Sequence, residues 1–74
     1  MEEKLIEIFR SVFTGVEPTD VNLNAEFREW DQYSSLTQVV LLDAITSKLN
    51  VKIKLRSFIK AQTIGDILDI IEEE

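Results

Sequence analysis

The 74-residue sequence contains no histidine and no cysteine. Without cysteine the chain forms no disulfide and offers no thiolate to a metal ion, and without histidine it lacks the commonest general base and zinc ligand. Its carboxylates form no organised cluster in the sequence, so we expect no metal site. A serine nucleophile needs a base to take its proton, most often histidine. We therefore predict that the chain is not an enzyme.

Glycine, proline and long apolar runs are also scarce. Two glycines, one proline and an apolar share of 45% are typical of a globular, largely helical domain. The length predicts a single domain, residues 1–74, with a small core. No apolar run approaches the roughly 18 residues of a membrane-spanning helix, so we expect no membrane insertion. We further expect a cytoplasmic monomer, and the absence of cysteine fits an intracellular location.

Basic residues are outnumbered, at 8 against 14 acidic residues, which gives a net charge of −6. This balance argues against DNA or RNA as a partner, because phosphate binding needs clustered Lys and Arg. The charge is arranged in blocks. Residues 15–34 sum to −4, residues 35–49 to zero, residues 50–62 to +4 and residues 63–74 to −5. Each block is therefore suited to a different kind of partner surface.

Apolar residues at helical spacing predict amphipathic helices at both ends of the chain. We expect one over residues 2–13, ended by Gly15 in a left-handed C-cap, and one over residues 63–73. Thr63 and Asp66 have the spacing of a capping box at the start of the second. The expected buried stripes are Leu5, Ile8, Phe9 and Val12 in the first helix, and Ile64, Ile67, Leu68 and Ile71 in the second.

The connections complete the predicted fold. Val21, Leu23 and Phe27 are too apolar for a solvated linker, so we expect them to hold residues 15–34 against the bundle. Residues 51–54 alternate as a strand would, but helical neighbours leave no partner strand, which favours an extended connection. Residues 56–60 are expected to form a brief helix with Phe58 and Ile59 inward. The fold class is all-α, a small four-helix bundle with a long first connection and a short third helix.

The central helix, predicted over residues 35–49 with Asn50 as its left-handed stop, has two distinct faces. The face expected to meet the core contains Leu41, Leu42, Ile45 and Leu49, with Val39 at its edge. The opposite face contains Leu36, Val40, Asp43 and Ser47. Apolar side chains on the outside of a helix indicate a partner-docking surface, although single exposed apolar residues are also common.

Ser34 and Ser35 stand where this helix begins. A serine before an apolar periodic run is a good N-cap, and this is the simplest interpretation of the pair. The same position also suits a modified serine, because free backbone N–H groups and the positive end of the helix dipole favour an attached phosphodiester. The two interpretations are compatible if Ser34 caps the helix and Ser35 is modified.

Four segments together resemble the acyl carrier protein family: residues 24–27 (NAEF), Ser35-Leu36, residues 49–53 (LNVKI) and residues 63–67 (TIGDI). The resemblance implies that Ser35 receives 4′-phosphopantetheine from coenzyme A through a phosphopantetheinyl transferase. The arm would carry acyl groups as thioesters to acyl-loading and acyl-processing enzymes of fatty-acid, polyketide or related lipid and secondary-metabolite synthesis. It also implies an acyl pocket between helices, lined by Val39, Leu42, Ile45 and Phe58.

The chain departs from the family pattern in two places. Ser34 stands where the family usually has Asp, and Thr37, Val40, Thr46, Ser47 and Lys48 stand where acidic residues are common. These departures favour a specialised carrier over the housekeeping carrier of fatty-acid synthesis. Beside Ser35, Trp30 and Tyr33 either clamp the loop onto the bundle or contact a partner.

Two other interpretations stay open at this point. The cargo can be aminoacyl or peptidyl instead of acyl. Alternatively, the chain is a small helical interaction domain without a prosthetic group, in which Ser35 is only a cap and the outer face of the central helix binds a partner permanently.

Overall fold

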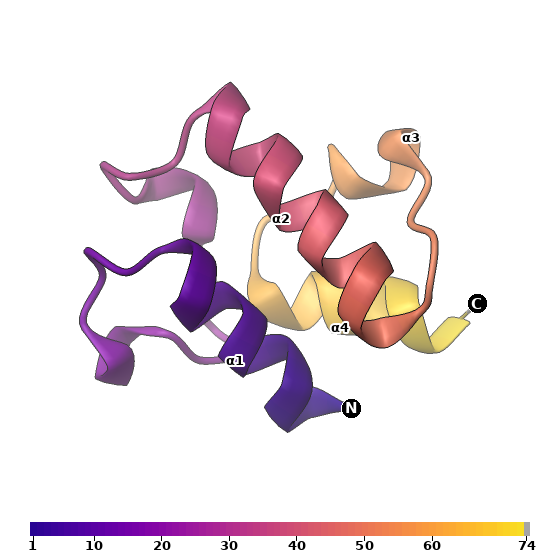
Figure 1. Cartoon of the computed structure of the whole chain (residues 1–74), viewed down its shortest axis with the longest axis horizontal. Coiled ribbons are helices and arrows are strands. Elements are labelled where there is room, and N and C mark those ends of the chain that lie inside the picture. Colours follow the sequence, from indigo (N-terminus) through magenta and orange to yellow (C-terminus); the bar gives the residue numbers. More distant parts are fainter. Residues whose placement is uncertain (74) are drawn as a thin grey trace.

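The computed structural model describes residues 1–73, and within them the chain is all-α, as predicted. It has the helices α1 (Glu2–Val12), α2 (Ser35–Leu49), α3 (Leu55–Phe58) and α4 (Ile64–Glu73), with short 3₁₀ helices at Pro18–Asp20 and Phe27–Glu29. Figure 1 shows the long connection folded back beside α1 and α2, and the brief α3 on the way to α4. Helix α1 packs against α2 and α4, and α3 packs against α4.

Helix α1 ends earlier than expected and without the help of Gly15. Of the predicted buried residues, Leu5, Ile8 and Phe9 are in the core and Val12 packs against it from a half-buried position. The C-cap is Phe13, at φ −107° and ψ 64°. Gly15 does not have a positive φ, so the predicted left-handed glycine cap is wrong. Phe13 keeps its ring in the core after the helix stops, stacked 6.0 Å from the ring of Phe9. Packing of that ring, and not glycine chemistry, accompanies the end of this helix.

The long connection is held against the bundle by the residues expected to do so. Val21 and Phe27 are buried, and Leu23 packs against the core. The backbone is also tied to the start of α4, because the N–H of Gly65 donates to the Leu23 carbonyl at 2.8 Å. A Cβ on Gly65 would approach that carbonyl to 3.0 Å, so this close contact favours glycine. These contacts fix the position of residues 27–34, which lead into α2.

The bounds of α2 agree with the prediction. Asn50 ends the helix in the left-handed region, at φ 55° and ψ 40°. Leu41 and Ile45 are buried, and Leu42 and Leu49 pack against the core from half-buried positions. Val39 was expected at the edge of this face, and that expectation is wrong because its side chain is 62% exposed. At about 100° per residue it lies within about 60° of Leu36 on the outer side of the helix.

Residues 51–54 form no paired strand, as expected, and lead into the single-turn helix α3. Phe58 is fully buried, whereas Ile59 is 60% exposed, so only one of the two residues predicted to point inward does so. The two residues are adjacent at the end of α3, so their side chains point in different directions. The small core covers only one of these directions.

Helix α4 begins with the predicted capping box. Asp66 donates its N–H to Thr63 Oγ1 at 3.1 Å, and its carboxylate accepts from the N–H groups of Thr63 at 3.1 Å and Gln62 at 2.9 Å. These backbone hydrogen bonds lower the pKa of Asp66 below its ordinary value of 3.8. The expected stripe is buried throughout, and its members are Ile64, Ile67, Leu68 and Ile71.

Candidate functional site

The two serines at the start of α2 have different structural roles. Ser34 is the N-cap, with extended backbone, and its Oγ accepts from the N–H of Thr37 at 3.2 Å. The N–H of Ser34 donates in return to Thr37 Oγ1 at 2.7 Å, which completes a capping box. Ser35 is the first helical residue, and it is exposed. The cap therefore uses the hydroxyl of Ser34, and the hydroxyl of Ser35, on an exposed residue, takes no part in it.

The backbone of the first turn of α2 favours an anion. The first N–H groups of an α-helix have no acceptor within the helix, and the capping box satisfies those of Ser34 and Thr37. The first turn of α2 contains no acidic residue. A phosphodiester on Ser35 would meet unpaired N–H groups and the positive end of the helix dipole without a carboxylate in the same turn.

The predicted outer face of α2 is exposed as expected. Leu36 is 72% exposed and Val40 46% exposed, and Asp43 and Ser47 are exposed beyond them. Val39 joins this face, so it presents three large apolar side chains within the first two turns after Ser35. Single exposed apolar residues are ordinary, but three on one side of one helix form a patch.

Trp30 and Tyr33 pack inward from the loop that precedes α2. Both are half-buried, and the ring of Trp30 lies edge-on to that of Phe13 at 5.1 Å. The ring of Tyr33 lies 5.7 Å from that of Phe27. These contacts favour the clamp interpretation of the two residues, because their rings are already in contact with rings of the core.

The four residues named for an acyl pocket do not share one environment. Ile45 and Phe58 are fully buried, Leu42 is half-buried and Val39 is exposed. A chain entering between α2 and α3 would have to displace packed side chains.

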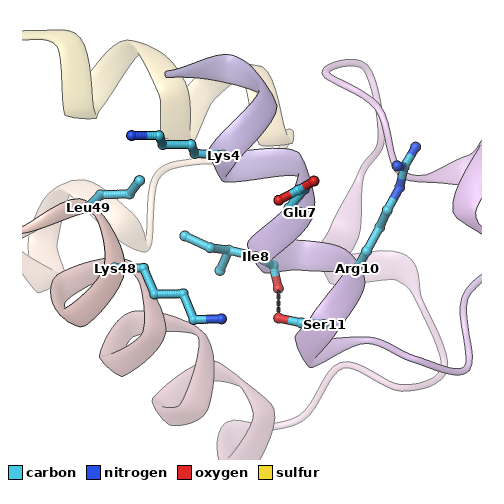
Figure 2. Close-up of a pocket in the computed structure, with 7 residues that line it drawn as sticks. All are labelled: Lys4, Glu7, Ile8, Arg10, Ser11, Lys48 and Leu49. Atoms are coloured by element: carbon cyan, nitrogen blue, oxygen red, sulfur yellow. Dashed lines mark hydrogen bonds between the residues drawn. The ribbon is translucent and has the colours of Figure 1, made fainter.

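A groove of about 500 Å³ lies elsewhere, between α1 and the last turn of α2 (Figure 2). Its lining includes Lys4, Ile8, Lys48 and Leu49, and Ser11 donates its hydroxyl to the Ile8 carbonyl at 2.9 Å. Lys48 is thirteen residues after Ser35, which places this groove about 20 Å from it along the helix.

Sequence reasoning missed Arg28. Its guanidinium is half-buried and donates to the backbone carbonyls of Phe58 and Ala61 and to the hydroxyl of Tyr33. The acceptors on α3 and just after it are 30 and 33 residues away in the sequence. No local pattern marks such contacts. The one signal in the sequence is a charged residue between Phe27 and Trp30, two aromatic residues of the loop that pack on the core.

Over residues 1–73 no group of three or more His, Cys, Asp or Glu side chains gathers in a way that could hold a metal ion. Within the same residues no helix is both long enough and apolar enough to span a membrane.

Comparison with known proteins gives one clear result. The profile of a family described as the phosphopantetheine attachment site matches residues 3–71, nearly the whole chain. No curated protein and no solved structure matched the chain. Members of this family carry a covalently attached 4′-phosphopantetheine and work with phosphopantetheinyl transferases and other partner enzymes, and they are carriers and not catalysts. The chain belongs to the phosphopantetheine attachment site family.

Proposed function

We propose that this carrier is an acyl carrier protein and that Ser35 is its attachment residue. The observation that supports this assignment is the division of roles at the start of α2, where Ser34 caps the helix and Ser35 is exposed. The chain contains no histidine to activate a serine from within. A serine that another enzyme modifies fits this composition better than a serine that attacks a substrate.

In the proposed modification the Ser35 Oγ attacks a phosphorus of the pyrophosphate of coenzyme A. An Oγ–P bond forms, the P–O bond to the nucleotide breaks, adenosine 3′,5′-bisphosphate leaves, and the hydroxyl proton passes to a base of the transferase. The free N–H groups at the start of α2 would hold the resulting phosphodiester anion. When bound, the arm supplies a terminal thiol that holds the cargo as a thioester.

We place partner docking on the outer face of α2, at Leu36, Val40, Asp43 and Ser47. Any enzyme that acts on Ser35 or its arm approaches the molecule here, and the exposed apolar side chains give it area to bury. Trp30 and Tyr33 support this surface from below, through their contacts with Phe13 and Phe27.

The cargo is proposed to be acyl, in fatty-acid, polyketide or related lipid or secondary-metabolite synthesis. Shelter for an acyl chain would come from parting Leu42, Ile45 and Phe58, with Val39 at the entrance. An aminoacyl or peptidyl cargo is the alternative, and loading assays with acyl and aminoacyl donors distinguish the two. A monomeric state and a cytoplasmic location stay predictions.

The experiment is incubation of the purified chain with coenzyme A and a broad-specificity phosphopantetheinyl transferase, followed by intact-mass measurement. We expect wild type to gain the mass of one phosphopantetheine and Ser35→Ala to gain none. An unmodified wild type, under conditions that modify a known carrier, would support the interaction-domain alternative.

A further inference from the structure

Arg28 connects two parts of the molecule that are distant in sequence. Its Nε donates to the Ala61 carbonyl at 2.7 Å, its Nη2 donates to the Phe58 carbonyl, and its Nη1 donates to the Tyr33 hydroxyl at 2.9 Å. The guanidinium also lies over the ring of Phe58, 4.9 Å from its centroid. Bonds from a charged donor are stronger than neutral ones, and the planar fork reaches three acceptors at once.

The connection continues from Tyr33 into α2. The Tyr33 hydroxyl accepts from Arg28 and donates to Gln38 Oε1 at 2.6 Å. Gln38 lies three residues after Ser35, in the next turn of the same helix. A chain of hydrogen bonds therefore runs from the end of α3, through two side chains, to the turn that follows Ser35.

Helix α3 depends on such external contacts for its position. It has four residues, and its N-cap makes no side-chain capping hydrogen bond. A helix this short is not stable by its own hydrogen bonds. Arg28 binds carbonyls on both sides of Ile59, a residue that is 60% exposed, so it fixes the orientation in which α3 presents that side chain.

We propose that Arg28 is a positioning residue that holds α3 and the first turns of α2 as one recognition surface for the enzyme that modifies Ser35. This inference rests on the proposed function. A standard protein interface covers about 800 Å² of each partner, which is about one sixth of the 4907 Å² surface of this chain. An enzyme seated at Ser35 must therefore contact more than one turn of α2. Arg28, through Tyr33 and Gln38, ties the turn after Ser35 to the segment that exposes Leu55, on α3, and Ile59, its C-cap.

The test is the steady-state kinetics of modification by a broad-specificity phosphopantetheinyl transferase with coenzyme A. In Arg28→Gln the KM for the carrier is expected to rise about five- to tenfold, the size of a typical interface contact. The kcat should change little, because Ser35 and the coenzyme A site of the transferase are intact. Arg28→Lys should not restore the wild-type KM, since one ammonium cannot reach all three acceptors. Tyr33→Phe keeps the ring and removes the hydroxyl link, and should raise the KM less.

The matched control is Arg10→Gln, which removes the same charge from α1, where Arg10 donates to the Pro18 carbonyl. Its KM should equal that of wild type. Amide hydrogen exchange at residues 58–61 should quicken in the Arg28 variants and stay unchanged in Arg10→Gln. If Arg28→Gln does not fold, Tyr33→Phe carries the same kinetic test.

The two proposals fail in different ways. Wild type that gains no phosphopantetheine overturns the proposed function, and this inference with it. Wild type that is modified, together with Arg28→Gln or Tyr33→Phe of unchanged KM, overturns the role of Arg28 alone.

Discussion

At the residue scale, the structure separates side chains whose roles are local from those whose roles are not. The capping boxes at Ser34–Thr37 and Thr63–Asp66 join residues three positions apart, so local sequence is enough to predict a cap at each place. Arg28 is different, because its acceptors are carbonyls that come near only when the chain has folded. No spacing rule could have predicted it.

Asp66 gives the chain a pH-dependent cap. Its pKa is lowered below 3.8 by hydrogen bonds from the N–H groups of Gln62 and Thr63, so its contribution to stability is complete above that value. The contribution is lost as the pH falls through the lower pKa of the folded state. Urea unfolding from pH 7 down to pH values below 3.8 should show a drop in free energy that is smaller in Asp66→Asn. At pH 7 the variant should lose about 0.5–1 kcal/mol.

The control for that measurement is Asp69→Asn, which removes an exposed carboxylate from the same helix. It should keep the acid-induced drop of wild type. Parallel pH curves for wild type and Asp66→Asn would contradict the role given to the Asp66 carboxylate.

At the element scale, periodicity predicts which helices form and where their main faces point, and it is weakest at the edges of those faces. The centre of the core face of α2, at Leu41 and Ile45, was predicted correctly. Val39 was not, because its burial depends on whether a neighbouring element covers that edge, and helix spacing says nothing about neighbours. Ile59 was misplaced for the same reason, since α3 is too short to show a period.

Helix α3 allows this orientation to be tested with adjacent residues. Phe58→Ala should lower the free energy of unfolding by about 3–5 kcal/mol, because it leaves a cavity in place of a fully buried ring. Ile59→Ala should change the free energy of unfolding by no more than about 0.5 kcal/mol. Urea denaturation of both variants measures the difference. Similar losses in the free energy of unfolding for the two variants would contradict an α3 that buries Phe58 and exposes Ile59.

The outer face of α2 is expected to be a docking surface driven by apolar contact. Val40→Glu should leave the melting temperature nearly unchanged, because Val40 is already 46% exposed. It should weaken loading or transfer by the cognate partner enzymes several-fold, since a carboxylate would be desolvated in the interface. Thr19→Glu adds the same charge at an exposed position in the long connection and serves as the control. Unchanged kinetics for Val40→Glu would mean that Val40 is ordinary surface.

At the scale of the whole molecule, charge and size act together. Fourteen acidic and eight basic residues produce a net charge of −6 on a chain of 74 residues. A domain of this size has a thin core, with an unfolding free energy of roughly 4–11 kcal/mol at the usual range per residue. Self-repulsion is therefore a noticeable part of its stability, and the +4 block between two acidic blocks offsets only some of it.

Stability should consequently rise with added salt and at mildly acidic pH. Moderate salt screens the repulsion between carboxylates, so the melting temperature at 25 mM salt should be lower than at about 0.15 M, where the Debye length is about 8 Å. Thermal melts over an ionic-strength series make the measurement. A melting temperature that falls steadily as salt is added would show that favourable ion pairs outweigh repulsion.

We propose that Ser35, and not its neighbour Ser34, holds the prosthetic arm. The most direct test of this proposal is fragmentation mass spectrometry of the peptide that contains both serines, after treatment with transferase and coenzyme A. We expect phosphopantetheine on Ser35 in wild type and in Ser34→Ala, a variant that should lose only about 1 kcal/mol of stability with its cap. Ser35→Ala should remain folded and unmodified. Phosphopantetheine found on Ser34, or on the Ser35→Ala variant, would contradict it.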